Sequence, residues 1–181
     1  MRGFGFLAVA GAIGLVGLAA GPVCAETVYF VVGEWPGEEI YGDSYVVPIE
    51  DPLDIQHARD LVMFGPEAVG DPIVVAAIEA GADGINRDWL APGAPEWSWH
   101  VTEFQGFAFA TIEILDGYPT FVEDNLAWWI ENTNQPSAPE VGHIGFWSYT
   151  IIAELPAVPE PSASGLAAVG LMFCLRFAKR R

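Results

Sequence analysis

Hydrophobic residues in the middle of the chain recur at two different spacings. A spacing of two places side chains on one face of a strand, so Val28, Phe30 and Val32 predict a strand over 27–32. The same reasoning predicts further strands at 45–49, 73–75, 97–101, 107–115 and 146–155. The run at 73–75 would also suit a helix, but its β-branched residues and the flanking Gly and Pro favour a strand. In the last strand, Trp147, Tyr149 and Ile151 are expected to share one face.

A helical spacing begins after residue 50. Asp51 is a good N-cap, Pro52 suits the first helical position, and Gly65-Pro66 ends the segment. The apolar residues of this helix fall on one face and are expected to be buried: Ile55, Ala58, Leu61 and Val62.

A second helix is predicted over residues 119–132. Thr120 and Glu123 have the spacing of a capping box. In this motif, each of the two side chains accepts a hydrogen bond from the backbone N–H of the other residue. Trp128 and Trp129 lie about 100° apart on a helix, so we expect one indole to be partly exposed. The predicted buried stripe is Val122, Leu126, Trp129 and Ile130.

These elements predict an α+β fold over residues 26–155. We expect a single small domain, with a mostly antiparallel sheet of about five or six strands and two helices. The helices are unevenly spaced among the strands, which argues against a regular βαβ array. Residues 81–96 form a long loop, and long loops in compact domains are often functional.

Charge separates this middle segment from the two ends of the chain. The formal net charge is −17, yet Arg59 and Arg87 are the only Lys or Arg residues between 26 and 155, where 23 of the 24 acidic residues lie. Such a surface repels nucleic acid and anionic lipid and attracts cations. The hydrophobic content of 52% is too high for a disordered chain. Both cysteines, Cys24 and Cys174, lie in the ends, so the domain has no disulfide and no thiolate site.

The first 25 residues have the parts of a secretory signal peptide. Arg2 precedes an apolar stretch, and small residues before Glu26 suit cleavage after Ala25. An uncleaved helical anchor and a lipoprotein at Cys24 are the alternatives, and Gly21-Pro22 favours cleavage.

Residues 156–181 combine a linker, a short apolar segment and a basic end. Pro159-Glu160-Pro161 is followed by an apolar run over 163–175, which is shorter than the roughly 20 residues of a permanent transmembrane helix. The basic residues that would stop the chain at the membrane are Arg176, Lys179, Arg180 and Arg181.

This order of parts resembles the PEP-CTERM sorting signal. The resemblance implies a Gram-negative host, signal peptidase and exosortase as processing partners, and removal of the transient membrane anchor. It also implies delivery to the cell envelope, the outer surface or the extracellular matrix, in the context of exopolysaccharide. An ordinary tail anchor that is never cleaved is the alternative.

The middle segment resembles a group of small secreted domains whose activity is unassigned. The similar parts are "INRDW", "WSWH" and "DGYPTFVE", which begin at Ile85, Trp97 and Asp116. This resemblance transfers no functional residue to the chain.

Three residues are the candidates for catalytic chemistry: His100, Arg87 and Asp88. His100 lies among aromatic residues in Trp97-Ser98-Trp99-His100 and could serve as a base, a metal ligand or the wall of a sugar-binding cleft. The alternative is a histidine hydrogen-bonded at the start of a strand. Convergence of His100, Arg87 and a carboxylate in an open pocket would favour an enzyme.

Arg87 is expected to form an ion pair, because it is one of two cations in a very acidic domain. Its candidate partners are Glu103, Glu113 and the residues next to Asp88. The alternative is that Arg87 binds an anionic group of a substrate.

The remaining chemistry concerns sugars and metals. Loop tryptophans such as Trp35, Trp89, Trp97 and Trp99 could stack on sugar rings. No cofactor is expected. Residues 83–88 contain oxygen ligands but lack the spacing of an EF-hand loop. Ca²⁺ held by carboxylates from different parts of the chain is therefore kept as an alternative.

We therefore expect an exported, non-enzymatic binding or structural protein that interacts with extracellular polysaccharide and not with nucleic acid. The alternative is a small secreted hydrolase or metal-dependent enzyme that uses His100 and nearby carboxylates.

Overall fold

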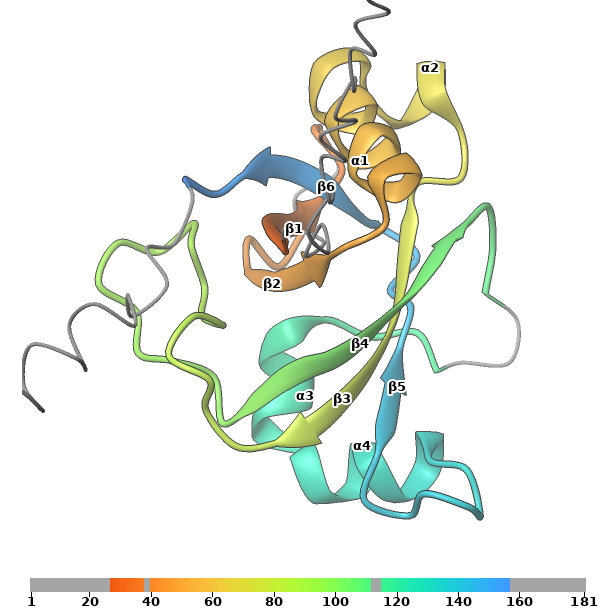
Figure 1. Ribbon diagram of the computed structural model, residues 1–181. Coiled ribbons are helices and arrows are strands. Elements are labelled where there is room, and N and C mark those ends of the chain that lie inside the picture. Colours follow the sequence, from red (N-terminus) through yellow and green to blue (C-terminus); the bar gives the residue numbers. More distant parts are fainter. Residues whose placement is uncertain (1–26, 38–39, 112–114, 157–181) are drawn as a thin grey trace, which may run out of the picture.

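The first and last strands of the domain pair with each other. The computed structural model describes residues 27–37, 40–111 and 115–156 (Figure 1). In it, β1 (Val28–Glu34) lies between β2 (Ser44–Ile49) and β6 (Tyr149–Glu154), and all pairings are antiparallel. We call these three strands sheet A. The backbone N–H of Leu155 donates to the carbonyl of Tyr29 at 2.8 Å, so the chain enters and leaves the domain at one end of this sheet.

A second antiparallel sheet, sheet B, is formed by the middle of the chain. Its central strand β3 (Ile73–Ala80) pairs with the long β4 (Trp99–Ala108) on one side and the short β5 (Gly142–Ile144) on the other. The prediction of one mostly antiparallel sheet is thus correct for strand direction and wrong for the number of sheets. Spacing along a chain shows which face of a strand is buried, but not which strand lies next to it.

The two sheets share one hydrophobic core. Side chains of Phe30 and Tyr45 from sheet A and of Ile78 and Trp99 from sheet B are fully buried in it. A smaller apolar cluster on the other side of sheet A joins Val31, Val46 and Leu155, with Ile85 of the 81–96 loop packed against it. The described residues therefore form a small α+β domain, as predicted, with six strands and four helices.

The first predicted helix is present and packs against sheet A (Figure 1). Helix α1 (Pro52–Phe64) begins at Asp51, whose carboxylate accepts from the N–H of Leu53 at 2.8 Å, and ends at Gly65. Ile55, Ala58 and Leu61 are buried as predicted, but the Val62 side chain is 43% exposed, because the packed stripe is narrower than the sequence suggests. The short helix α2 (Pro66–Val69) follows directly.

The second predicted helix is two helices. Helix α3 (Pro119–Asp124) and helix α4 (Leu126–Thr133) meet at Asn125, whose backbone leaves the helical region. The predicted capping box is wrong. Thr120 donates its hydroxyl to Asp43, and Glu123 accepts from the backbone and the hydroxyl of Ser98, so both side chains bond outside their own helix. The predicted stripe is correct at its centre, since Val122 and Trp129 are fully buried.

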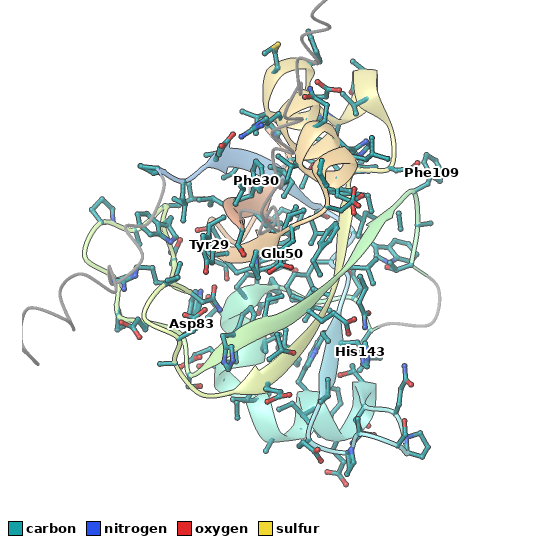
Figure 2. The ribbon with its side chains drawn as sticks, in the orientation of Figure 1. Tyr29, Phe30, Glu50, Asp83, Phe109 and His143 are labelled. Atoms are coloured by element: carbon teal, nitrogen blue, oxygen red, sulfur yellow. The ribbon has the colours of Figure 1, made fainter. Side chains whose placement is uncertain are left out.

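The strand predicted at 107–115 is mostly absent from the described residues. Strand β4 ends at Ala108, and Phe109 is 79% exposed beyond that end (Figure 2). The apolar composition of residues 107–115 suggested a buried strand, but Phe109 lies at the surface. Strand β5 has no counterpart among the predicted strands, and Trp147, expected to share one face with Tyr149 and Ile151, lies before β6 and is 50% exposed.

Both predicted targeting segments lie outside the described residues. This applies to residues 1–25 and to the tail, including Pro159, Glu160, Pro161, Arg176, Lys179, Arg180 and Arg181. Among the helices of the described part, none is long and apolar enough to span a membrane.

The adjacent indoles of α4 allow a matched test of the core. Trp129 is fully buried and donates its indole N–H to the His143 carbonyl at 3.0 Å, whereas Trp128 is 48% exposed. We expect Trp129→Ala to lower the free energy of unfolding by about 3–5 kcal/mol. Trp128→Ala should lower it by less than about 1 kcal/mol. Urea unfolding monitored by circular dichroism measures both, and equal losses would contradict the assigned burial.

Candidate functional site

The His100 side chain is engaged in a local contact. It lies on β4 opposite Glu79, and its Nδ1 is 2.8 Å from the carbonyl oxygen of Gly81 at the end of β3. This matches the alternative in which the histidine is hydrogen-bonded at the start of a strand. His100 lines none of the three hollows described below.

Arg87 and Asp88 hold the 81–96 loop against sheet A. The Arg87 guanidinium donates to the Gly84 carbonyl at 3.0 Å and to Glu96 at 3.2 Å, so the predicted ion pair exists with a partner that the sequence did not single out. The Asp88 carboxylate accepts from the hydroxyl of Ser44 on β2 at 2.8 Å. Neither side chain lines a described hollow, and no pocket among the three brings them together with His100.

A neighbouring side chain explains why this loop is ordered. Asn86 is 1% exposed, accepts from the backbone N–H of Val46 at 2.8 Å, and donates to the Trp99 carbonyl at 2.9 Å. It thus supplies an acceptor for one backbone N–H on the edge of β2 that does not pair with β1. The Asn-Arg-Asp segment at 86–88 therefore has an evident structural purpose.

The largest of the three hollows lies at the opposite end of sheet A from the chain's entry and exit. It has a volume of about 390 Å³. Its walls come from the segment after β1, from the residues before and within α3, and from the start of β6: Ile40, Tyr41, Asp116, Tyr118, Phe121 and Tyr149. We call it the aromatic pocket.

The Glu34 carboxylate forms one support of the aromatic pocket. Glu34 ends β1 and is 5% exposed. It accepts from the backbone N–H groups of Ile40 and Tyr41 at 2.9–3.1 Å and from Gly42 at 2.7 Å. These N–H donors compensate a buried negative charge, with which no cation of the described residues forms an ion pair. The charge in turn fixes the backbone that carries the Tyr41 ring.

The Asp43 carboxylate forms the second support. It is 4% exposed and uses both oxygens. One oxygen accepts from the Tyr149 hydroxyl of β6, and the other accepts from the Thr120 backbone at 2.8 Å and the Thr120 hydroxyl at 2.6 Å. Asp43, which lies just before β2, thereby joins the start of that strand to β6 and to the first turn of α3.

Aromatic rings line the space between these supports. Tyr41 and Tyr118 stack face to face, with ring centroids 3.7 Å apart and an angle of 10° between the planes. Tyr118 contacts Phe121, which meets the buried Trp129 edge to face. Tyr41 is 50% exposed, so part of its ring is available to a ligand.

The loop at 115–117 completes the wall. The Asp116 carboxylate accepts from the backbone N–H of Trp147 at 3.1 Å and of Gly117 at 3.0 Å, and the residue is exposed. Gly117 lies so close to Trp129 that an added Cβ would stand 2.7 Å from the indole. Only glycine lets this loop pass over the core at that point.

Burial strongly alters the acidity of two tyrosines next to the pocket. Burial raises the pKa of Tyr149 far above its ordinary value of 10.0, and the hydrogen bond to Asp43 and the charges of Asp43 and Glu34 raise it further. Burial alone raises the pKa of Tyr45, whose hydroxyl has no hydrogen-bond partner among the described residues. Both side chains therefore stay neutral in the folded domain.

A second hollow of about 260 Å³ between α1 and β4 is acidic. It is lined by Glu50, Asp51, Asp54 and Glu103, among others. Burial, followed by the charge of Asp51, raises the pKa of Asp54, while His57 acts in the opposite direction. No group of three or more His, Cys, Asp or Glu side chains in the described ranges is arranged to hold a metal ion, so the structure adds no support for Ca²⁺.

The third hollow, about 90 Å³, lies where the chain enters and leaves, between Tyr29, Arg59 and Glu154. Arg59 of α1 donates to Glu154 through two nitrogens, each at 2.8 Å. These bonds lower the pKa of Glu154 and attach α1 to the last strand.

Sequence reasoning missed Glu34, Asp43, Tyr41 and Tyr118. The sequence did contain a usable signal. Glu34 directly follows the apolar run of β1, and no other polar residue separates it from that run. An acidic residue in that position must find donors or leave the core. The donors lie six to eight residues later and could not be seen from spacing.

The buried tyrosines predict a loss of stability at high pH. Because the folded-state pKa of Tyr149 and of Tyr45 is raised above 10.0, the folded domain keeps protons that the unfolded chain releases. Their contribution to stability is complete below about pH 10 and is lost progressively above it. Tyr149→Phe should reduce the slope of unfolding free energy against pH by about 1.4 kcal/mol per pH unit between roughly pH 10 and 12. Urea titrations across this range measure the slope, and an unchanged slope would contradict the assignment.

The comparisons with known proteins identify one family. The family model of the BP-74 N-terminal domain matches residues 26–158, which include all of the described elements. No curated protein and no solved structure gives a significant match. Because this match covers most of the 181 residues, the chain belongs to the BP-74 N-terminal domain family.

Proposed function

We propose that this chain is an exported, non-enzymatic binding protein of the cell envelope or extracellular matrix, and that its aromatic pocket binds a glycan. The observation that carries the proposal is the pocket itself. Binding sites for small molecules are concave, largely apolar, and contain a few placed polar groups. The aromatic pocket has this character, since the rings of Tyr41, Tyr118 and Phe121 lie beside the Asp116 carboxylate.

A pyranose ring suits these walls. Its axial C–H groups form an apolar face that packs on an aromatic ring, while its hydroxyls need donors and acceptors at the edge. The exposed part of Tyr41 offers the ring face, and the Asp116 carboxylate offers acceptors within the same hollow. The volume of about 390 Å³ is at the lower end of the range for drug-sized ligands and suits one or two sugar units.

The pocket is also rigid before any ligand arrives. Glu34 and Asp43 hold the backbone on both sides of the Tyr41 and Tyr118 pair through hydrogen bonds of 2.6–3.1 Å. A site that is already ordered loses less conformational entropy on binding. This property favours a binding function over a purely structural one.

Delivery to the envelope is proposed from the two ends of the sequence. The signal-peptide pattern before Glu26 supports export and cleavage by signal peptidase. The PEP-CTERM-like tail supports recognition by an exosortase and a transient anchor in the inner membrane. Such a route would bring the acidic domain to a surface rich in polysaccharide.

The enzyme alternative receives less support from the geometry. It requires His100 to act with nearby carboxylates, yet the ring is bonded to the Gly81 carbonyl and Arg87 is paired with Glu96. The acidic hollow near Asp54 is lined by carboxylates, and the described ranges contain no group of three or more His, Cys, Asp or Glu side chains arranged to hold a metal ion.

Removal of an aromatic wall should weaken glycan binding. We expect Tyr118→Ala to weaken binding of oligosaccharides at least about tenfold, because a ring-stacking contact is worth roughly 0.5–1.5 kcal/mol beyond its buried area. The matched control is Phe109→Ala, which removes an aromatic side chain that is 79% exposed at the far end of β4. Glycan-array screening followed by isothermal titration calorimetry measures the affinities. Equal affinity of both variants would remove the pocket from the proposal.

The sorting proposal has its own test. Glu160→Gln should impair tail processing while leaving the melting temperature of the domain unchanged, because Glu160 lies outside the described fold. Mass spectrometry of envelope fractions detects the change. In the unaltered protein, the mature form should lack residues 1–25 and the basic end. A mature form that still ends at Arg181 would contradict tail removal.

A further inference from the structure

Among the described residues, every formal charge around the aromatic pocket is negative. Asp116 lies in its wall, and Glu34 and Asp43 lie directly behind Tyr41 and Tyr149. The two cations of the domain are used elsewhere, Arg59 with Glu154 and Arg87 with Glu96. A potential of one sign in a partly enclosed space is strengthened by the low dielectric of its walls.

The two inner carboxylates are not neutralised by a cation of the described residues. Glu34 and Asp43 are 5% and 4% exposed, and their partners are neutral N–H and O–H groups. Hydrogen bonds of this kind stabilise the charges and leave them in place. Their field therefore adds to that of Asp116 at the pocket.

Aromatic rings supply the second part of a cation site. A ring face attracts a cation within about 6 Å of its centre through the quadrupole of the π system. Tyr41 and Tyr118 line the pocket together with Asp116, and Tyr41 is 50% exposed in addition to the face that stacks on Tyr118. No Lys or Arg of the described ranges lines the pocket. Arg87 already makes this type of contact elsewhere, 5.9 Å from the ring of Trp89.

From these observations we infer that the aromatic pocket selects glycans with a free amine, such as 2-amino-2-deoxy sugars whose nitrogen is not acetylated. The inference rests on the proposed glycan binding and specifies its ligand class. The ammonium group lies against the ring of Tyr41 or Tyr118 and faces Asp116, while the sugar ring packs on the remaining aromatic surface.

Other glycan classes fit the charges less well. A uronic acid would place a carboxylate next to Asp116 and in the field of Glu34 and Asp43, and like charges repel. A neutral or N-acetylated sugar would stack on the rings but would gain nothing from the negative potential. The ranking of ligands is therefore amine-bearing first, neutral second and anionic last.

The experiment compares three trisaccharides by isothermal titration calorimetry on the domain without its signal peptide and tail: β-1,4-linked glucosamine, its N-acetylated form and a galacturonic acid trimer. At about pH 5.5 the free amines of the sugar are protonated and ordinary carboxylates are ionised. We expect the glucosamine trimer to bind about tenfold tighter than the N-acetylated trimer, as one cation–π contact near a carboxylate would provide. The galacturonic trimer should bind least.

Five variants separate a specific site from general attraction to an acidic protein. Tyr118→Phe should keep the preference for the amine, and Tyr118→Ala should remove it. Tyr41→Ala provides a further test if Tyr118→Ala unfolds, which circular dichroism detects. Asp116→Asn should reduce the preference, whereas the control Glu67→Gln, which removes an exposed charge on α2, should not.

The outcomes are distinct. Equal or tighter binding of the N-acetylated trimer would overturn the inference and leave glycan binding intact. Absence of binding to all three trimers would overturn the proposed function as well. Amine binding that survives both alanine variants, or that falls equally in Glu67→Gln, would show general electrostatic attraction and overturn the pocket assignment.

Discussion

The described domain depends on how one buried carboxylate, that of Asp43, is compensated. Its two oxygens bond to Tyr149 of β6 and to Thr120 at the first turn of α3, so a single side chain connects the start of β2, the last strand and a helix 77 residues away in sequence. Loss of this carboxylate would leave the buried hydroxyl of Tyr149 without an acceptor, at a cost of about 1–3 kcal/mol. The position of α3 relative to sheet A, and with it the aromatic pocket, follows from this bond.

The same solution appears at Glu34 and suits an acidic chain. With two arginines in the domain and both in ion pairs near the surface, the interior charges must be compensated by neutral donors. A backbone N–H has a direction that the chain sets, so it compensates a charge only when the chain adopts one geometry. This requirement fixes the walls of the pocket, and no cation of the described residues pairs with the charges behind it. Stability and the proposed ligand preference would therefore have a common origin.

Local patterns predicted local structure well. The cap at Asp51, the stop at Gly65, the first strands and the burial of Trp129 beside an exposed Trp128 all followed from spacing and side-chain chemistry. Prediction failed where a distant partner decides the outcome. Thr120 and Glu123 look like a capping box but bond to Asp43 and Ser98, and the apolar stretch after Ala108 lacks a neighbouring strand among the described residues. The candidate site was missed for the same reason, since Asp43 and the ring of Tyr149 are 106 residues apart in sequence and the sheets bring them together.

The close approach of the domain's two ends has a consequence for its orientation. The chain enters beside Tyr29 and leaves at Pro156, next to Arg59, whereas Glu34 and Tyr149 lie at the other end of the same two strands. A strand of seven residues is about 20 Å long, so the pocket stands roughly that far from the attachment point. Whatever holds the chain at either terminus holds the domain by one pole and presents the opposite pole outward. A tethered copy would therefore sample its surroundings with the tyrosine pair foremost, and neighbouring copies on one surface would display their pockets side by side.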